Sequence, residues 1–542
     1  MARLTASGKV IGAAISGDGK FVAYVSSDQG LQSLWVRQIG AAQSLQLVPP
    51  QSVGYWGHRF APDGSIVYGV KSREQPGGAF YQISVLGGEP RKILTGIDSS
   101  PTFSPDGKQL AFLRGRHPSD ERSSVVVANI DGTGERTLAS VRSPEYFVPI
   151  FYAGPSWSPD GTQIAAAIVD RQRQAGRIAG IDVKSGAIRT IAEGRWEVVS
   201  QVEWTPQGDG LLAIAQRAGA EQRNQVWYVP YPTGAPSQIT NDLFDYRMIS
   251  VTDDGKSLVT VASDANSDLW IHREGSAPKK ITSAKMEGAL GVAPLRDGRI
   301  VTTSLESGKL DIWLMNADGS GRTLLTRGAN DNFKPVLTPD ERSVVYIANP
   351  TEGVSICRMN LDGSDRRVLV RQNGPQTQLS VSPDGKYVVY PTASPAGKNH
   401  MVLARVPIDG GTPQYLTDYP ADTPAYSPDG TRIAAYSQTH IVILPSEGGA
   451  QVQKLEVAPA FGFSRILWTP DGRSLLVNTM PRDRANLWQV PLDGSAPRKL
   501  TEFDERMLMW FAPLPDAKGW IFARGDLSRD AVMISGWRPA AR

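Results

Sequence analysis

Cysteine is almost absent from the chain, and its scarcity restricts the possible chemistry. Cys357 is the only cysteine among 542 residues, which excludes an internal disulfide. It lies in residues 355–358, a stretch typical of a strand, so we expect a packed, inert thiol rather than a nucleophile. The sequence also lacks an apolar run long enough to span a membrane and an apolar signal-peptide core near Met1. One interpretation of these absences is that the chain is a fragment of a larger protein.

The chain has no strong charge bias. It contains 57 Lys and Arg against 54 Asp and Glu, a formal net charge of +3. The basic residues are spread over the sequence, and the short runs at residues 114–116 and 171–173 lack the clustering of a nucleic-acid-binding surface. We therefore predict no nucleic-acid partner.

Signatures of known catalytic sites are missing too. The sequence has no Gly-x-Ser-x-Gly turn, no α/β-hydrolase-like region after its repeats and no phosphate-binding Gly-Lys-Ser/Thr loop. Its five histidines lie in different repeats, and none pair as His-x-x-x-His. These absences argue against an enzyme and predict neither a cofactor nor a metal site.

What the chain has is a tetrapeptide that returns along its whole length. The form Ser/Thr-Pro-Asp-Gly, with Ala61 replacing the hydroxyl residue in the first full copy, occurs at residues 61–64, 104–107, 158–161, 382–385, 427–430 and 469–472. Weaker copies fall in phase at residues 16–19, 205–208, 252–255, 295–298, 338–341 and 514–517. Together these are twelve repeats of about 45 residues, a period that indicates a repeat architecture.

Each repeat predicts four short antiparallel strands. Pro and Asp suit the centre of a type I turn, and Gly accepts the left-handed conformation that follows, so the tetrapeptide closes a hairpin. A β-rich run follows it, then a third run such as residues 311–314, then often a second turn centred on Asp-Gly. The repeat ends on Leu-Thr or Ile-Thr, as at residues 500–501. Four strands without helical periodicity describe one propeller blade.

This order of motifs resembles the WD40-like (PD40) repeats of the TolB propeller. Similar arrays occur in prolyl-peptidase propellers and in tandem propeller sensor domains of bacterial signalling proteins. The resemblance implies an all-β fold and a periplasmic or extracytoplasmic location, with a protein partner. Because this repeat serves many functions, it does not by itself imply one activity.

Twelve blades exceed one ordinary ring, so we predict two tandem six-bladed β-propellers, residues 1–285 and 286–542. An uneven division, such as seven and five blades, is the alternative. The last repeat offers three runs, at residues 508–511, 520–523 and 531–535, but no terminal Leu-Thr run. Residues 3–7 carry such a run, so we expect them to complete a blade and close one of the rings.

Candidate binding residues lie in the loops that cross from one blade to the next. We place the site on the first ring, where these loops are aromatic and charged, and aromatics with arginine favour binding. The predicted site residues are Tyr55, Trp56, His58, Tyr146, Phe147, Arg195, Trp196, Glu197, Tyr246 and Arg247. The equivalent loops of the second ring contain residues 330–334, 376–378, Tyr419, Asp422, 461–465 and 504–506. The alternative is a purely structural role, in which about half of these aromatic side chains pack between blades.

The functional prediction from the sequence is a non-enzymatic module that binds a peptide, protein or small ligand at a propeller mouth. It would form the sensory or interaction part of a bacterial envelope or signalling system. The alternative is a propeller-type lyase or hydrolase with a metal or polar site in one axial channel. Among the histidines, His58 is the one whose position approaches such a channel.

Overall fold

The repeated tetrapeptide forms the hairpin that its residues predict, as the computed structural model shows in detail. At residues 427–430, the Ser427 hydroxyl donates to Asp429 Oδ1 at 2.5 Å and accepts the Arg432 N–H at 3.0 Å. Gly430 has a φ of 72°, the left-handed conformation that favours glycine. The hydrogen bonds from Ser427 and from the Thr431 N–H lower the pKa of Asp429 to about 2.

In several blades the Leu-Thr run makes a second recurrent contact. The Ile312 N–H donates to Thr326 Oγ1 at 2.9 Å, and that hydroxyl donates to Asp311 Oδ1 at 2.7 Å. The Leu487 N–H and Thr501 make the same contact at 3.0 Å. The threonine hydroxyl therefore joins the fourth strand of the blade to its third.

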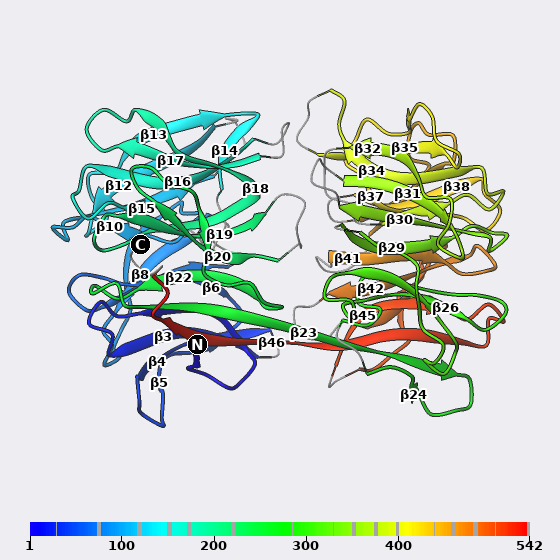
Figure 1. Cartoon of the computed structure of the whole chain (residues 1–542), viewed down its shortest axis with the longest axis horizontal. Coiled ribbons are helices and arrows are strands. Elements are labelled where there is room, and N and C mark those ends of the chain that lie inside the picture. Colours follow the sequence, from blue (N-terminus) through cyan, green and yellow to red (C-terminus); the bar gives the residue numbers. More distant parts are fainter. Residues whose placement is uncertain are drawn as a thin grey trace. The chain divides into compact units, whose positions relative to one another are not determined.

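The structure describes residues 1–28, 30–72, 77–115, 122–148, 154–170, 175–217, 223–283, 286–328, 330–349, 354–372, 378–396, 400–437, 440–456, 462–480, 486–503 and 506–538. All of its regular elements are β-strands (Figure 1). Within these residues, no helix is long and apolar enough to cross a membrane.

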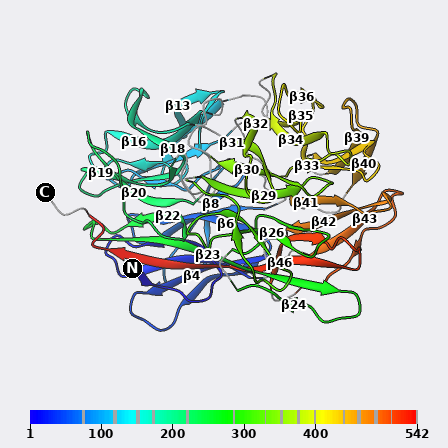
Figure 2. The ribbon, with the colours of Figure 1, turned by 45° about the vertical axis from the view of Figure 1, so that its right-hand side comes forward.

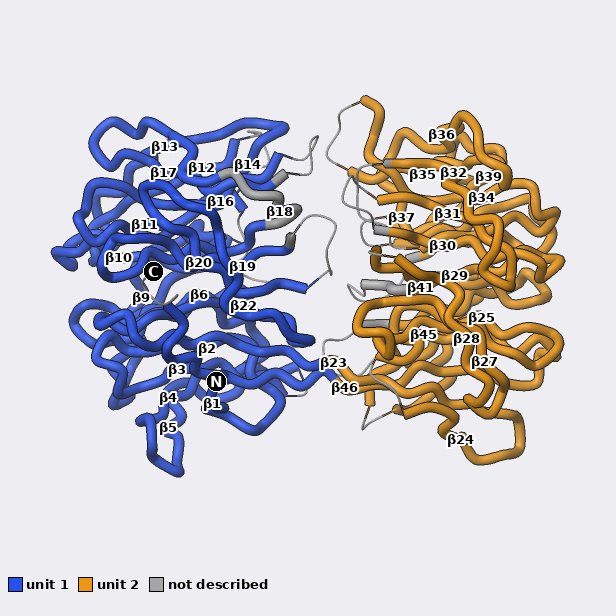
Figure 3. Tube along the Cα trace, viewed as in Figure 1, with its two compact units in different colours: residues 1–218, 222–264, 527–542 blue, residues 219–221, 265–526 orange. Residues whose placement is uncertain are grey.

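The first compact unit consists mainly of residues 1–218, 222–264 and 527–542 (Figure 3). Its first three blades are single four-stranded sheets. They contain β2 (Val10–Ile15), β3 (Phe21–Asp28), β4 (Leu31–Gln38) and β5 (Leu45–Gln51); β6 (Gly54–Phe60), β7 (Ile66–Lys71), β8 (Ala79–Ile83) and β9 (Arg91–Thr95); β10 (Thr102–Phe103), β11 (Gln109–Arg114), β12 (Arg122–Asn129) and β13 (Arg136–Arg142).

An eight-stranded sheet holds the next two blades of this unit. It contains β14 (Glu145–Phe147), β15 (Ser156–Trp157), β16 (Gln163–Asp170), β17 (Ala175–Asp182), β18 (Ile188–Trp204), β19 (Gly210–Arg217), β20 (Gln225–Pro230) and β21 (Ser237–Gln238). The two blades merge because β18 pairs with β17 along its first part and with β19 along its second.

The second compact unit consists mainly of residues 265–526. Five of its blades are single sheets of four strands, β25 to β44 in sequence order. The strands are β25 (Val292–Pro294), β26 (Ile300–Ser304), β27 (Asp311–Met315), β28 (Thr323–Leu324); β29 (Asp331–Leu337), β30 (Ser343–Asn349), β31 (Val354–Asn360), β32 (Arg367–Gln372); β33 (Ser380–Val381), β34 (Tyr387–Ala393), β35 (Met401–Pro407), β36 (Gln414–Tyr415); β37 (Asp422–Tyr426), β38 (Arg432–Ser437), β39 (His440–Pro445), β40 (Gln453–Glu456); β41 (Gly462–Trp468), β42 (Ser474–Met480), β43 (Leu487–Pro491) and β44 (Arg498–Lys499).

Two long strands supply the sixth blade of both units. β23 (Ser257–Arg273) and β46 (Gly519–Ser535) are neighbours in one sheet and lie side by side in Figures 1 and 2. In the first unit this blade adds β22 (Asp245–Val251) to β23 and β1 (Ala2–Arg3) to β46; in the second unit it adds β24 (Lys279–Lys280) to β23 and β45 (Met507–Pro513) to β46. Each unit thus has six blades, which confirms the predicted all-β double propeller.

The sharing of these strands changes where the units divide and how the blade closes. The sequence placed one border between residues 285 and 286, whereas the compact units divide after Asp264 and again after Asp526. The N-terminal residues do complete a blade, because Ala2 and Arg3 pair with Met533 and Val532 in the first unit. The three C-terminal runs, however, do not share one blade as predicted.

Candidate functional site

The first strands of successive blades meet around the axis of each unit, where their backbones are linked by side chains. In the first unit, Ser250 Oγ accepts the Ile15 N–H at 3.1 Å, and Gln201 bonds the backbone of Ile249 at 2.9 Å through both its amide atoms. These contacts join the first strands of neighbouring blades. The residues of these strands are therefore the ones that line the axis.

Most of these axial strands carry a β-bulge. Register shifts occur between Trp56 and Arg59, between Phe333 and Val336, and between Asp422 and Ala425, among others. The bulged segments contain non-glycine residues in the left-handed region, Met248 at φ 61°, Lys334 at 53° and Thr423 at 52°. A bulge re-aims a side chain, and such strained backbone is enriched at functional sites. The axial bulges are therefore candidate positions for chemistry.

An ion pair spans the axis of the first unit. Arg59 donates two hydrogen bonds to the Glu203 carboxylate, at 3.0 and 2.6 Å, and the side chains are only 11% and 16% exposed. Arg59 belongs to the second blade and Glu203 to the fifth, which face each other across a six-bladed ring. Burial raises the pKa of Glu203, and the charge of Arg59 opposes that rise. The pair closes this axis with its charges neutralised.

His58 lies beside that pair and is completely buried. A Cβ at Gly12 would come within 2.6 Å of His58 Cε1 and 2.8 Å of Met248 Sδ, so glycine is needed there. Burial, helped by the positive charge of Arg59, lowers the pKa of His58 to about 3. The imidazole is therefore neutral at physiological pH and packs as part of the core.

The axis of the second unit carries charges that are arranged differently. Lys334 lies in the bulge of β29, and Asp422 begins β37 two blades further on. Burial lowers the pKa of Lys334 to about 8, against the opposing effect of the Asp422 carboxylate. The Asp422 carboxylate in turn accepts the Thr423 N–H at 2.5 Å. An amine that loses its proton near neutral pH is suited to general-base chemistry.

Arg465, in the bulge of β41, is the second cation on this axis. Its guanidinium carbon lies 4.5 Å from the ring centre of Trp510 and 5.7 Å from that of Phe511. Its Nε and Nη1 are sealed from solvent and have no hydrogen-bond acceptor among the residues that the structure describes. Burial lowers the pKa of Arg465 to about 9.

Gln378 holds the strands around Arg465 in place. Its amide nitrogen donates to the Pro424 carbonyl at 3.0 Å and to the Ile466 carbonyl at 2.8 Å, and its amide oxygen accepts the Ile466 N–H at 3.0 Å. The side chain is buried, so three successive blades are tied together at the axis. The backbone next to Arg465 is thereby fixed.

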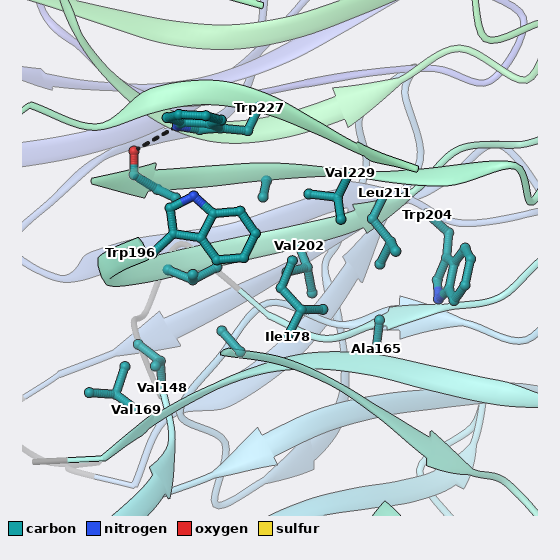
Figure 4. Close-up of a cluster of buried hydrophobic side chains, with 14 residues drawn as sticks. Val148, Ala165, Val169, Ile178, Trp196, Val202, Trp204, Leu211, Trp227 and Val229 are labelled. Atoms are coloured by element: carbon teal, nitrogen blue, oxygen red, sulfur yellow. Dashed lines mark hydrogen bonds between the residues drawn. The ribbon is translucent and has the colours of Figure 1, made fainter. Parts of the chain in front are cut away.

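The predicted aromatic site residues of the first unit lie mostly in the cores between blades. Tyr55, Trp56, Phe147, Trp196 and Tyr246 are 0–7% exposed. Trp196 packs edge to face on Trp227, with ring centres 6.3 Å apart, in the hydrophobic cluster of Figure 4. The Tyr246 hydroxyl donates to Asp242 at 2.6 Å. These five side chains stabilise the blades, and a binding role for them stays a prediction.

The remaining predicted site residues are more exposed or lie outside the described side chains. Tyr146 is half-buried against the same cluster, and Arg247 pairs with Asp245 at 3.2 Å. The side chains of Arg195 and Glu197 are not among those described. In the second ring, residues 376–377, 461 and 504–505 also lie outside the described part of the chain.

The axial charges were not selected from the sequence. Lys334, Asp422 and Arg465 stood among the second-ring loop residues, as did Gln378. Arg59 and Glu203 carried no signal that distinguished them. The available signal was a charged residue a few positions before the repeated turn in an otherwise apolar strand. In the described chain, no group of three or more His, Cys, Asp or Glu residues is placed to hold a metal ion.

The chain matches no protein-family model. Over 236 residues it is 22% identical to dipeptidyl-peptidase 5 of Porphyromonas gingivalis, and the match covers 42% of this chain and 33% of that protein. The chain thus matches about a third of the length of this curated relative.

Two solved structures give weaker likenesses. The tricorn protease is 13% identical to this chain, with a TM-score of 0.35. The match covers 99% of this chain and 63% of the tricorn chain. A putative TolB from Agrobacterium tumefaciens is 18% identical to this chain, with a TM-score of 0.21. The match covers 60% of this chain and 99% of the TolB chain. The double β-propeller fold itself rests on the sheets described above, in agreement with the repeats.

These relatives correct the functional prediction. The prediction of a non-enzymatic binding or scaffolding module is wrong, because the curated relative that the chain matches over 236 residues is a peptidase. The prediction that the chain is not an enzyme is overturned by the same finding. The alternative, a hydrolase with a polar site on one axis, is the better-supported interpretation.

Proposed function

We propose that this chain is a hydrolase that acts on peptides and that its polar site lies on the axis of the second unit. The observation that carries the proposal is Lys334, a partly buried amine held by a strained bulge on that axis. The similarity to a dipeptidyl-peptidase over 236 residues supports the choice of a peptide as substrate. The first unit is the poorer candidate, because Arg59 and Glu203 neutralise each other across its axis.

The chemistry follows from the protonation state of Lys334. With a pKa of about 8, the amine is partly neutral under mildly alkaline conditions. Neutral Lys334 takes a proton from water while the water oxygen bonds to the peptide carbonyl carbon. The carbon–nitrogen bond then breaks, and the proton passes from Lys334 to the leaving amine. Asp422 opposes the loss of the proton and so sets the pH at which the base becomes available.

The partner is a short peptide, and an extracytoplasmic location is proposed on the resemblance of the repeats to TolB. A sensory role, which the same resemblance implied, does not form part of the proposal.

The test is hydrolysis of short peptides by the purified chain, followed through the new amino termini. Wild type is expected to cleave with a rate that rises through about pH 8, because only the neutral amine acts as a base. Lys334→Met and Lys334→Arg should both lose cleavage, since arginine keeps the charge but does not give up its proton. Lys386→Met, which removes a lysine 74% exposed in a turn, is the matched control and should cleave normally. Absence of cleavage by wild type, or full activity of folded Lys334→Arg, would overturn the proposal.

A further inference from the structure

Arg465 carries a buried charge that the described chain does not neutralise. Its Nε and Nη1 have no acceptor there and no contact with solvent, although the residue as a whole is only partly buried. Sealing two nitrogens of a guanidinium from water without an anion is disfavoured, which the lowered pKa of Arg465 reflects. A partner from outside the chain would complete this site.

Other arginines that stack on aromatic rings show what is missing. Arg114, Arg322 and Arg538 lie 5.2–5.4 Å from ring centres, and each also pairs with a carboxylate at 2.7–3.0 Å. Arg405 lies 4.4 Å from the Tyr387 ring and pairs with Glu447 at 2.5 Å. Arg465 has the ring contacts of this group, but no carboxylate of the described residues pairs with it.

The surroundings of Arg465 suit a planar anion. Trp510 supports one face of the guanidinium at 4.5 Å, and Gln378 fixes the adjoining backbone of Ile466. A guanidinium oriented by an aromatic platform presents a planar fork of donors, whose geometry matches a carboxylate. The first unit makes the same match internally, between Arg59 and Glu203.

We propose that Arg465 binds the free C-terminal carboxylate of a peptide on the axis of the second unit. This inference rests on the proposed function for the choice of a peptide, and it names the part of the substrate that is recognised. The carboxylate supplies the negative charge and the acceptors that the described residues do not offer to Arg465. Peptides with a free C-terminus are therefore preferred over the same peptides with a C-terminal amide.

The experiment is calorimetric titration of the full chain with an N-acetylated tripeptide and with its C-terminal amide. Wild type should bind the carboxylate form more tightly, and Arg465→Gln should weaken that binding by about 10–100-fold, the range of a charge-assisted hydrogen bond. Binding of the amide should not change. Arg465→Lys should restore part of the affinity, because it returns the charge but not the fork.

Arg432→Gln is the matched control. Arg432 also stacks on a tryptophan, 4.9 Å from the Trp468 ring centre, but its guanidinium bonds the Gly472 carbonyl. This variant should bind both peptides as wild type does, and thermal unfolding should show that all variants are folded. Equal binding of the two peptides by wild type, or unchanged binding by folded Arg465→Gln, would overturn the inference. Tighter competition by inorganic phosphate than by acetate would also overturn it, because the site would then select another anion.

Failure of this inference differs from failure of the proposed function. Cleavage that depends on Lys334 without any preference for the carboxylate removes only the role of Arg465. A carboxylate preference that depends on Arg465, with no cleavage of any peptide, removes the hydrolase and leaves the binding site.

Discussion

At the level of single residues, the two units differ in the way in which the charges on their axes are neutralised. Arg59 and Glu203 satisfy each other through two hydrogen bonds, whereas Lys334 and Arg465 lie on different blades. Burial raises the pKa of Glu203 and lowers those of Lys334 and Arg465, so in each case it favours the neutral form. Desolvation thus shifts the pKa of each of these axial groups toward its neutral form, and a neighbouring opposite charge, where one is present, opposes the shift.

Removal of one member of the Arg59–Glu203 pair should destabilise the first unit. Glu203→Gln leaves a buried arginine without its counter-ion, so we expect a loss of about 3 kcal/mol in the free energy of unfolding. The double variant Arg59→Met, Glu203→Leu should recover much of this loss, because it leaves no buried charge. Urea denaturation provides the measurement.

The matched control for this prediction is Glu145→Gln. Glu145 also forms a two-pronged pair, with Arg177 at 2.9 Å, but the side chains are 37% and 23% exposed. Its loss should cost about 1 kcal/mol or less. If Glu203→Gln were as mild as this control, the axial pair would have no special role in stability.

Among the elements, the turn of each blade is the most uniform. Where the turn begins with Ser or Thr and has Asp at its third position, the aspartate accepts hydrogen bonds from that hydroxyl and from the backbone two residues after it. Asp18, Asp384 and Asp429 are examples. These bonds lower the pKa of each of the three carboxyls. The turns therefore contribute stability that depends on their ionised aspartates.

The chain should lose stability in acid because of these turns. A carboxyl whose pKa is lowered on folding stabilises the fold above its unfolded pKa of 3.8 and ceases to do so as the pH falls toward about 2. Asp429→Asn should make the free energy of unfolding slightly less dependent on pH, because it removes the contribution of one turn while the other turns keep theirs. Unfolding by urea at a series of pH values between 5 and 2, with both proteins, measures the difference; parallel curves would contradict the prediction.

At the scale of the whole molecule, two strands make the units depend on distant parts of the sequence. β46 contributes Ala523 to a core of the second unit and Ala531 to a core of the first. Both alanines are completely buried. Substitution of Ala523 or Ala531 therefore tests the stability of one unit each, although both residues belong to the same strand.

Aspartate at each position should disturb a different unit. Ala531→Asp places a charge in the core that holds Val10 and Val259, and Ala523→Asp places one in the core that holds Leu269 and Val292. Each should cost several kcal/mol, because a buried unpaired charge is strongly disfavoured. Hydrogen exchange should accelerate in the first unit for Ala531→Asp and in the second for Ala523→Asp. The same exchange pattern in both variants would contradict the division of β46 between the units.

The repeats made the blades predictable, but not their assembly. Residues 427–430 and the Leu-Thr run predict contacts that act within one blade, and the structure has them. The position of β46 was not predictable, because its two parts pair with strands more than 200 residues away in sequence, such as β1 and β23. The aromatic residues selected as a site, Trp196 among them, proved to be buried, since an aromatic side chain suits a core as well as a binding surface.

The sequence by itself determined the all-β class, the blade and the number of repeats, because turn chemistry and strand alternation act over a few neighbouring residues. Only the tertiary structure decided which charges reach an axis and which of them are neutralised. Arg59 meets Glu203 from the opposite side of a ring. Arg465 stacks on Trp510 from the next blade, and none of the carboxylates that the structure describes pairs with it. Such contacts depend on ring closure, which brings together residues that local sequence does not relate.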